Sequence, residues 1–124
     1  MSTIKADNIA TLAGVSTSMA NAVNGSAKAW VVFNGTGTLS VSSSYGVSSV
    51  TDSGTGRYTV NFNSGIFTSD PAVTVAHNFA ASGGYYNDVS ISSLSTTSVQ
   101  ILNWRQGFTG EVDTSINCVV AHGS

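Results

Sequence analysis

Side chains that could bind a metal ion are few in this chain and far apart. The two histidines, His77 and His122, each stand at the end of an expected strand. With Asp88 or Asp113 they could form a metal site, but no two of these residues have close ligand spacing. Cys118 is the single cysteine, which excludes an intrachain disulfide and a cysteine-based zinc site. We expect strand-end histidines that form hydrogen bonds and no cofactor, although copies of one histidine could still meet a metal on a symmetry axis.

Catalytic chemistry has no matching arrangement of residues. No serine lies in a G-x-S-x-G sequence, which presents the nucleophile in many hydrolases. Paired carboxylates for glycoside cleavage must face each other across a groove. The acidic residues instead fall in or beside expected turns, where a carboxylate caps backbone amides. These residues are Asp52, Asp70, Asp88, Glu111 and Asp113. The pattern predicts a protein that is not an enzyme.

Aromatic residues in the second half of the chain supply the one candidate ligand surface. Residues 79–87 form a glycine-rich loop with two tyrosines, and Trp104 precedes a second turn. Tyr and Trp rings can stack on sugars, yet the same residue types anchor subunit interfaces. The candidate contacts, for a glycan or for a neighbouring subunit, are Phe79, Tyr85, Tyr86, Trp104, Arg105 and Phe108.

The elements that must position these residues are strands and turns throughout, from residue 29 onward. Residues 57–62 alternate cleanly between apolar and polar side chains, which is typical of a strand with one buried face. Turn signals recur about every 8–12 residues, which predicts an all-β, antiparallel β-sandwich. The expected strands span residues 30–34, 39–45, 47–51, 57–62, 72–77, 86–93, 98–104 and 115–122.

The same alternation predicts which side chains form the core. We expect the following inward faces: Tyr58, Val60 and Phe62; Val73 and Val75; Val89 and Ile91; Val99 and Ile101; Ile116, Cys118 and Val120. Cys118 is thus expected to be a small buried apolar residue. In the first strand Val32 blurs the alternation, which indicates a strand covered on both faces.

The chain divides near Lys28 into an N-terminal arm, residues 1–28, and a β-sandwich domain, residues 29–124. Small residues dominate the arm, with a short strand expected in residues 3–9 and a short helix in residues 16–23. Such a segment has too little apolar area to offset its chain entropy alone. We expect it to dock on another subunit or partner; the alternative is a disordered leader.

Composition favours a protein that works in an assembly. Charged residues make up 8% of the chain, well below the usual share of about 25%. A surface so poor in charge suits contact with neighbouring copies, although a Ser/Thr-rich secreted β domain would also show it. The four basic residues are scattered and the net charge is −2, so no nucleic-acid surface is expected. No apolar run is long enough to insert into a membrane, and the N-terminus lacks the pattern of a signal peptide.

One stretch also resembles a known group of proteins. Residues 28–38 read KAWVVFNGTGT and residues 47–62 read VSSVTDSGTGRYTVNF. Together they resemble a module of tail-fibre and other virion proteins of tailed bacteriophages, particularly phages of cyanobacteria and other aquatic hosts. The opening STIKADNIATLAG is similar to the start of such proteins. The similarity covers about half of the chain, and Val32 departs from it by replacing a polar residue.

The resemblance implies a non-enzymatic structural part of the virion, made in the host cytoplasm. A short homotrimeric tail fibre involved in host attachment is the main expectation. Residues 2–27 would then bind other virion proteins or other copies, and the sandwich could contact a host-surface glycan. Two alternatives remain: a capsid decoration protein of the cement or head-fibre type, and a stand-alone carbohydrate-binding module.

Overall fold

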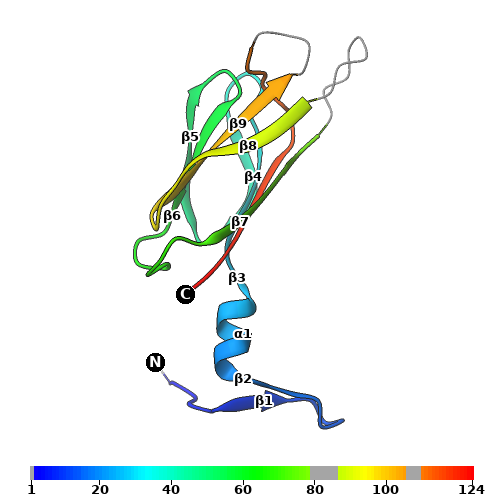
Figure 1. Ribbon diagram of the computed structural model, residues 1–124, viewed down its shortest axis with the longest axis vertical. Coiled ribbons are helices and arrows are strands. Elements are labelled where there is room, and N and C mark those ends of the chain that lie inside the picture. Colours follow the sequence, from blue (N-terminus) through cyan, green and yellow to red (C-terminus); the bar gives the residue numbers. More distant parts are fainter. Residues whose placement is uncertain (1, 79–86, 106–109) are drawn as a thin grey trace.

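A computed structural model describes residues 2–78, 87–105 and 110–124, and their regular structure is almost entirely β. Two antiparallel four-stranded sheets face each other in a sandwich-like body (Figure 1). The first sheet has the strand order β4-β3-β10-β7, and the second has the order β5-β6-β9-β8. The strands are β3 (Ala27–Asn34), β4 (Ser40–Tyr45), β5 (Val47–Gly54), β6 (Arg57–Phe62), β7 (Ala72–His77), β8 (Asn87–Leu94), β9 (Ser98–Arg105) and β10 (Asn117–His122). The predicted all-β antiparallel class is confirmed.

Strand limits agree closely with the sequence pattern, with a few differences at the ends. β6 and β7 have the predicted limits, whereas β3 begins earlier, at Ala27, and β5 continues to Gly54. β10 begins two residues later than predicted because Ile116 still belongs to the preceding turn. Alternation and turn residues therefore located every strand of the two sheets to within a few residues.

The core lies between the two sheets. Its buried apolar residues are Ala29, Val31, Phe33, Tyr58, Val60, Phe62, Phe67, Val99, Ile101, Val119 and Ala121. Val73, Val75 and Val89 are partly buried against this core, as predicted. Ile91 was also expected in the core but is 40% exposed, because β8 is an edge strand with a neighbour on one side only.

The predicted inward face of β10 is wrong by one residue. Asn117, Val119 and Ala121 point inward and are buried. Cys118 and Val120 are half-buried on the other face, and Ile116 is 49% exposed. In the sequence NCVVAH each alternating set has one polar residue, Asn117 or His122, and two small or apolar ones, so a period of two cannot distinguish them. Cys118 is therefore not the buried core residue that the pattern predicted.

The N-terminal segment, residues 2–26, forms an arm beneath the sandwich (Figure 1). β1 (Asn8–Ala10) and β2 (Ser16–Ser18) pair as a small antiparallel hairpin, and α1 (Met19–Gly25) follows. The Ser18 hydroxyl caps α1 by accepting a hydrogen bond from the amide of Asn21 at 3.1 Å. The expected short strand and helix are both present, but the strand occupies only the end of residues 3–9 and the helix begins later.

Candidate functional site

The predicted aromatic contacts are only partly visible. Phe79, Tyr85, Tyr86 and Phe108 lie outside the described residues. Trp104 and Arg105 are the last two residues of β9, which ends at the end of the sandwich far from α1 (Figure 1). Trp104 is 43% exposed, and Arg105 is half-buried. The structure therefore places one exposed indole at the end of the molecule opposite the arm.

Charged side chains surround Trp104 on the outer face of the second sheet. Asp88 of β8 pairs directly with Trp104, and Glu111 forms an isolated β-bridge with it. Arg57 of β6 pairs with Leu102, the next residue on the outer face of β9. An aromatic ring flanked by carboxylates and a guanidinium can stack on a sugar and bond its hydroxyls. The geometry is equally suitable for a protein contact with a Trp and Arg anchor.

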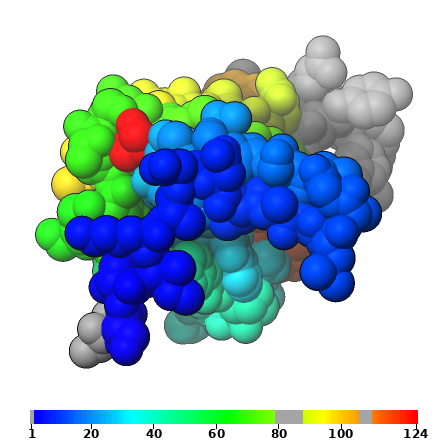
Figure 2. Space-filling model, turned by 90° about the horizontal axis from the view of Figure 1, so that it is seen from below, coloured from blue at the N-terminus to red at the C-terminus, as the bar shows by residue number. Residues whose placement is uncertain are grey.

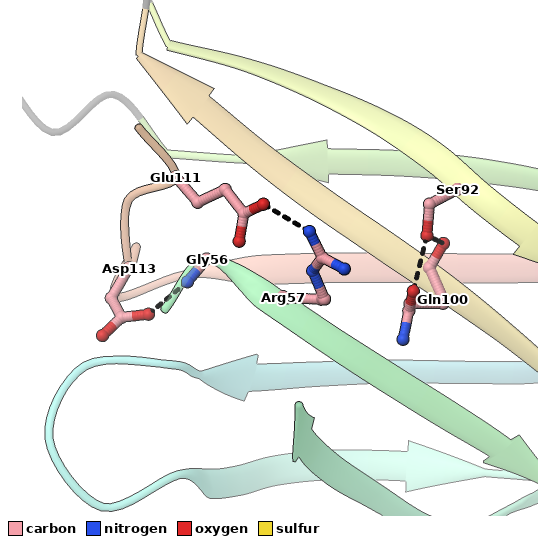
Figure 3. Close-up of polar contacts among 6 residues, drawn as sticks. All are labelled: Gly56, Arg57, Ser92, Gln100, Glu111 and Asp113. Carbon is pink, nitrogen blue, oxygen red and sulfur yellow. Dashed lines mark hydrogen bonds and ion pairs between the residues drawn. The ribbon is translucent and has the colours of Figure 1, made fainter. Parts of the chain in front are cut away.

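Glu111 and Asp113 are engaged in contacts that hold the segment after β9 (Figure 3). Nη2 of Arg57 donates to Oε1 of Glu111, and this hydrogen bond raises the pKa of Arg57 further above its ordinary value. The amide of Gly56 donates to Oδ1 of Asp113 at 2.7 Å. Gly56 has a φ of +68°, and a Cβ there would come within 2.6 Å of the backbone nitrogen of Val112. Through these hydrogen bonds the two carboxylates hold residues 110–116, the segment after β9, against the β5–β6 turn.

Tyr58 extends the same attachment into the core. Its hydroxyl donates to Oδ1 of Asp113 at 2.7 Å and lies 3.1 Å from the carbonyl oxygen of Gly35. A Cβ at Gly35 would lie 2.1 Å from this hydroxyl, so only glycine fits there. Burial, and then the bond to the Asp113 carboxylate, raise the pKa of Tyr58 well above its ordinary value.

A buried polar cluster joins the two sheets at this end. Nδ2 of Asn103, on β9, donates to Oγ1 of Thr114 and to Oδ1 of Asn117, both at 2.8 Å. The Thr114 hydroxyl also donates to Oδ1 of Asn117 at 2.7 Å, and Nδ2 of Asn117 donates to the carbonyl oxygen of Thr114 at 3.0 Å. All three residues are fully buried. The cluster connects β9 of the second sheet to β10 of the first.

Sequence reasoning missed this cluster, although one signal was present. Asn103 alternates with Val99 and Ile101, so the period of two already placed its amide on the inward face. Oδ1 of Asn103 is buried without a hydrogen-bond partner. The other polar atoms of these three side chains form hydrogen bonds, which indicates a structural role in holding the two sheets together.

Polar side chains cross the centre of the outer face of the second sheet. Ser53 and Thr59 share a hydrogen bond at 2.9 Å, Nε2 of Gln100 donates to Thr59 at 3.3 Å, and Ser92 donates to Oε1 of Gln100 at 2.8 Å. Figure 3 shows the pair of Ser92 and Gln100 on neighbouring strands. One hydrogen-bonded row thus runs over all four strands, which is compatible with a face in contact with water.

The histidines and acidic residues do not gather into a reactive site. His77 lies opposite Asn117 and His122 lies opposite Ala72, so the two histidines stand at opposite ends of the β7–β10 pair. The ring of His77 is within 3.0 Å of the carbonyl oxygen of Asn78, a strand-end hydrogen bond of the expected kind. Among residues 2–78, 87–105 and 110–124 there is no group of three or more potential metal ligands. None of the helices in those ranges has the length and apolar character that a membrane crossing requires.

The arm presents apolar side chains without covering them. Ile4 is 92% exposed, Leu12 is fully exposed, and Val15 is 71% exposed. Ile9 and Val15 line a shallow hollow in the β1–β2 hairpin. Figure 2 shows the arm, in blue, spread across the end of the sandwich when the molecule is seen from below. These residues form a second candidate contact surface, at the end opposite Trp104.

Comparisons of the chain with protein-family models, curated proteins and solved structures give no match.

Proposed function

We propose that this chain is a non-enzymatic structural subunit of a tailed-phage virion, most simply a short homotrimeric tail fibre that helps attach the particle to its host. The observation that carries the proposal is the arm. Every residue from 2 to 17 is exposed, and α1 contributes no buried residue. The proposed partners are other copies of the chain and other virion proteins.

Physical chemistry requires a partner for such an arm. A helix of seven residues is shorter than the roughly 12–15 residues at which isolated helices become marginally stable in water. A two-stranded hairpin is also marginal by itself. Exposed side chains such as Ile4 and Leu12 stabilise the arm only when they pack against another surface that removes them from water. An arm of this kind is suited to docking on a particle or on neighbouring subunits.

The arrangement of the sandwich fits a projecting part. The arm leads into β3 at one end, and the Trp104 end lies at the other (Figure 1). A subunit held by its arm would therefore present Trp104 and the surrounding charged residues away from the attachment point. This polarity supports the fibre over the decoration protein, whereas the resemblance of residues 28–62 to virion modules supports a virion part of either kind.

A second candidate is a carbohydrate-binding module, and the exposure of Trp104 beside Asp88 favours it. This function needs only one copy and no docked arm. Binding to a glycan array by a monomeric chain, lost in Trp104→Ala and retained in Trp30→Ala, would favour the module. A fibre that contacts a glycan would bind similarly but as an oligomer.

The arm can be tested with matched charge changes in the full chain. We expect the double variant Leu12→Glu, Val15→Glu to lose assembly in light scattering, because it places charges in the proposed contact. The control Ser2→Glu, Thr3→Glu adds the same charge at polar positions and should assemble normally. Both should keep the thermal melt of the sandwich. A wild-type chain that stays monomeric at micromolar concentration with an ordered arm would overturn the proposal.

Location on the particle needs a separate experiment. Antibodies against the chain should label phage particles in electron micrographs of lysate from the source culture. Label on tails supports the fibre, and label over the head surface supports the decoration protein. Particles without label would contradict both.

A further inference from the structure

The middle residues of the two central strands of the first sheet are apolar on both faces. Lys28, Asn34 and His122 point outward at the ends of the same strands. On the inward face β3 has Val31 and Phe33, which are buried in the core. On its outward face the same strand has Trp30 and Val32. β10 likewise turns Val119 inward while Cys118 and Val120 point outward. Strands that are apolar on both faces are typical of sheets that are covered on both sides.

Strand pairing gathers the outward residues into two continuous rows. One row crosses the sheet from β4 to β7 through Tyr45, Trp30, Val120 and Thr74. The adjacent row consists of Ser43, Val32, Cys118 and Ala76. Directly paired residues have Cβ atoms about 5 Å apart, so neighbouring side chains within each row are close enough to pack against each other. We call these two rows the apolar face; Trp30 is 36% and Tyr45 is 62% exposed on it.

The second sheet provides an internal control for this observation. Its corresponding outward rows are Thr51, Thr59, Gln100 and Ser93 in one case and Ser49, Asn61 and Ser98 in the other. Every one of these side chains is polar. The centre of this outer face is therefore suited to water, and Leu102 and Trp104 point outward only toward the end of β9.

We propose that the apolar face packs against the same face of further copies of this chain, as the subunit interface of the assembly. This inference rests on the proposed function only in requiring that copies assemble. Neither row contains a charged side chain, so the rows of identical faces can meet without repulsion between like charges. The outward residues Lys28 and His122 lie beyond the rows, at the ends of β3 and β10.

Area indicates that the face and the arm act together. Four strands about 4.8 Å apart and two rows that span about 13 Å of strand give a face of roughly 250 Å². A stable interface buries about 800 Å² on each partner, so the face supplies about a third. The arm adjoins the apolar face, because Val23 of α1 and Tyr45 of the face line one hollow, which Lys28 also lines. The rest of the area that stable association needs would come from the arm.

A charge on the apolar face tests the proposal in the full chain. We expect Val120→Glu to reduce the mass in solution to that of one chain and to weaken association at least a hundredfold. Thr59→Glu is the matched control, since Thr59 faces outward from a central strand of the second sheet. It should assemble like the wild type. A folded Val120→Glu variant with wild-type mass would overturn the inference.

Two further measurements keep the test decisive if Val120→Glu does not fold. Val120→Thr preserves shape and should weaken association by about tenfold. In the wild type, Cys118 should react slowly with a maleimide in the assembled state and faster after dilution to single chains. A labelling rate that does not change with assembly would contradict the apolar face.

The outcomes separate this inference from the proposed function. If the wild type assembles and the arm variant dissociates it while Val120→Glu does not, the arm contact stands and the apolar face is wrong. A wild type that never assembles contradicts both proposals.

Discussion

The two sheets of this protein have the same number of strands and contribute similarly to the core, yet their outer faces are opposite in character. β6 alternates Tyr58, Val60 and Phe62 inward with Arg57, Thr59 and Asn61 outward. β10 has small or apolar residues in both directions apart from Asn117 and His122 at its two ends. The inner faces stabilise the sandwich, because they supply the apolar area that folding buries. The outer faces determine what the folded chain can contact: water for the second sheet and, as we propose, another copy of the chain for the first.

The largest expected effect is the difference between substitutions on the inner and outer faces of β6. Val60→Asp puts an unpaired carboxylate into the core, at a cost of several kcal/mol out of the roughly 5–15 kcal/mol that stabilises a domain. We expect the domain to unfold. Thr59→Asp, one residue away on the outer face, should melt within a few degrees of the wild type. Equal thermal stability of the two variants would refute the assigned faces.

The second expectation concerns the buried cluster that joins the sheets. Asn117→Ala removes bonds to Asn103 and Thr114 and leaves their buried groups unpaired, at a cost of about 2–4 kcal/mol. The control Asn61→Ala removes amide bonds to Ser49 and Thr51 on the outer face and should cost less than about 0.5 kcal/mol. Urea unfolding measures both. Similar losses would show that the cluster does not hold the sheets together.

A third, smaller effect depends on pH. The folded-state pKa of Tyr58 lies above its ordinary value of 10.0, so its contribution is fully present below that pH and is lost as pH rises further. Tyr58→Phe should cost about 1–3 kcal/mol at neutral pH through the lost bond to Asp113, and it should flatten the decline of stability above pH 10. Unfolding curves between pH 7 and pH 11 are the measurement.

The smallest effect on folding sharpens the contrast between the faces. The double variant Thr59→Val, Gln100→Val would give the second sheet an apolar centre like that of the first. We expect the free energy of unfolding to change by less than about 1 kcal/mol, because both positions lie on the outer face. Light scattering should nevertheless show new, concentration-dependent association. Unchanged solution behaviour would mean that an apolar outer face is not sufficient for contact.

Local sequence determined much of this fold. Alternation and glycine-rich turns predicted the all-β class, the position of each strand along the chain and the inward faces of β6 and β9. In a strand with one face in water, polar and apolar residues alternate, so the sequence shows which side chains point inward. Low charge and an arm of small residues without its own core also favoured contact with other surfaces, which stays a prediction.

Only the tertiary structure decided the rest. The direction of β10 depends on which neighbours it pairs with, since both of its faces could be buried. The contacts of Asn103 with Asn117 and of Tyr58 with Asp113 join positions far apart along the chain, so no local pattern contains them. The apolar face arises in the same way: Trp30 and Val120 become one surface only when β3 and β10 pair, because side chains on separate strands acquire a shared face through the sheet itself.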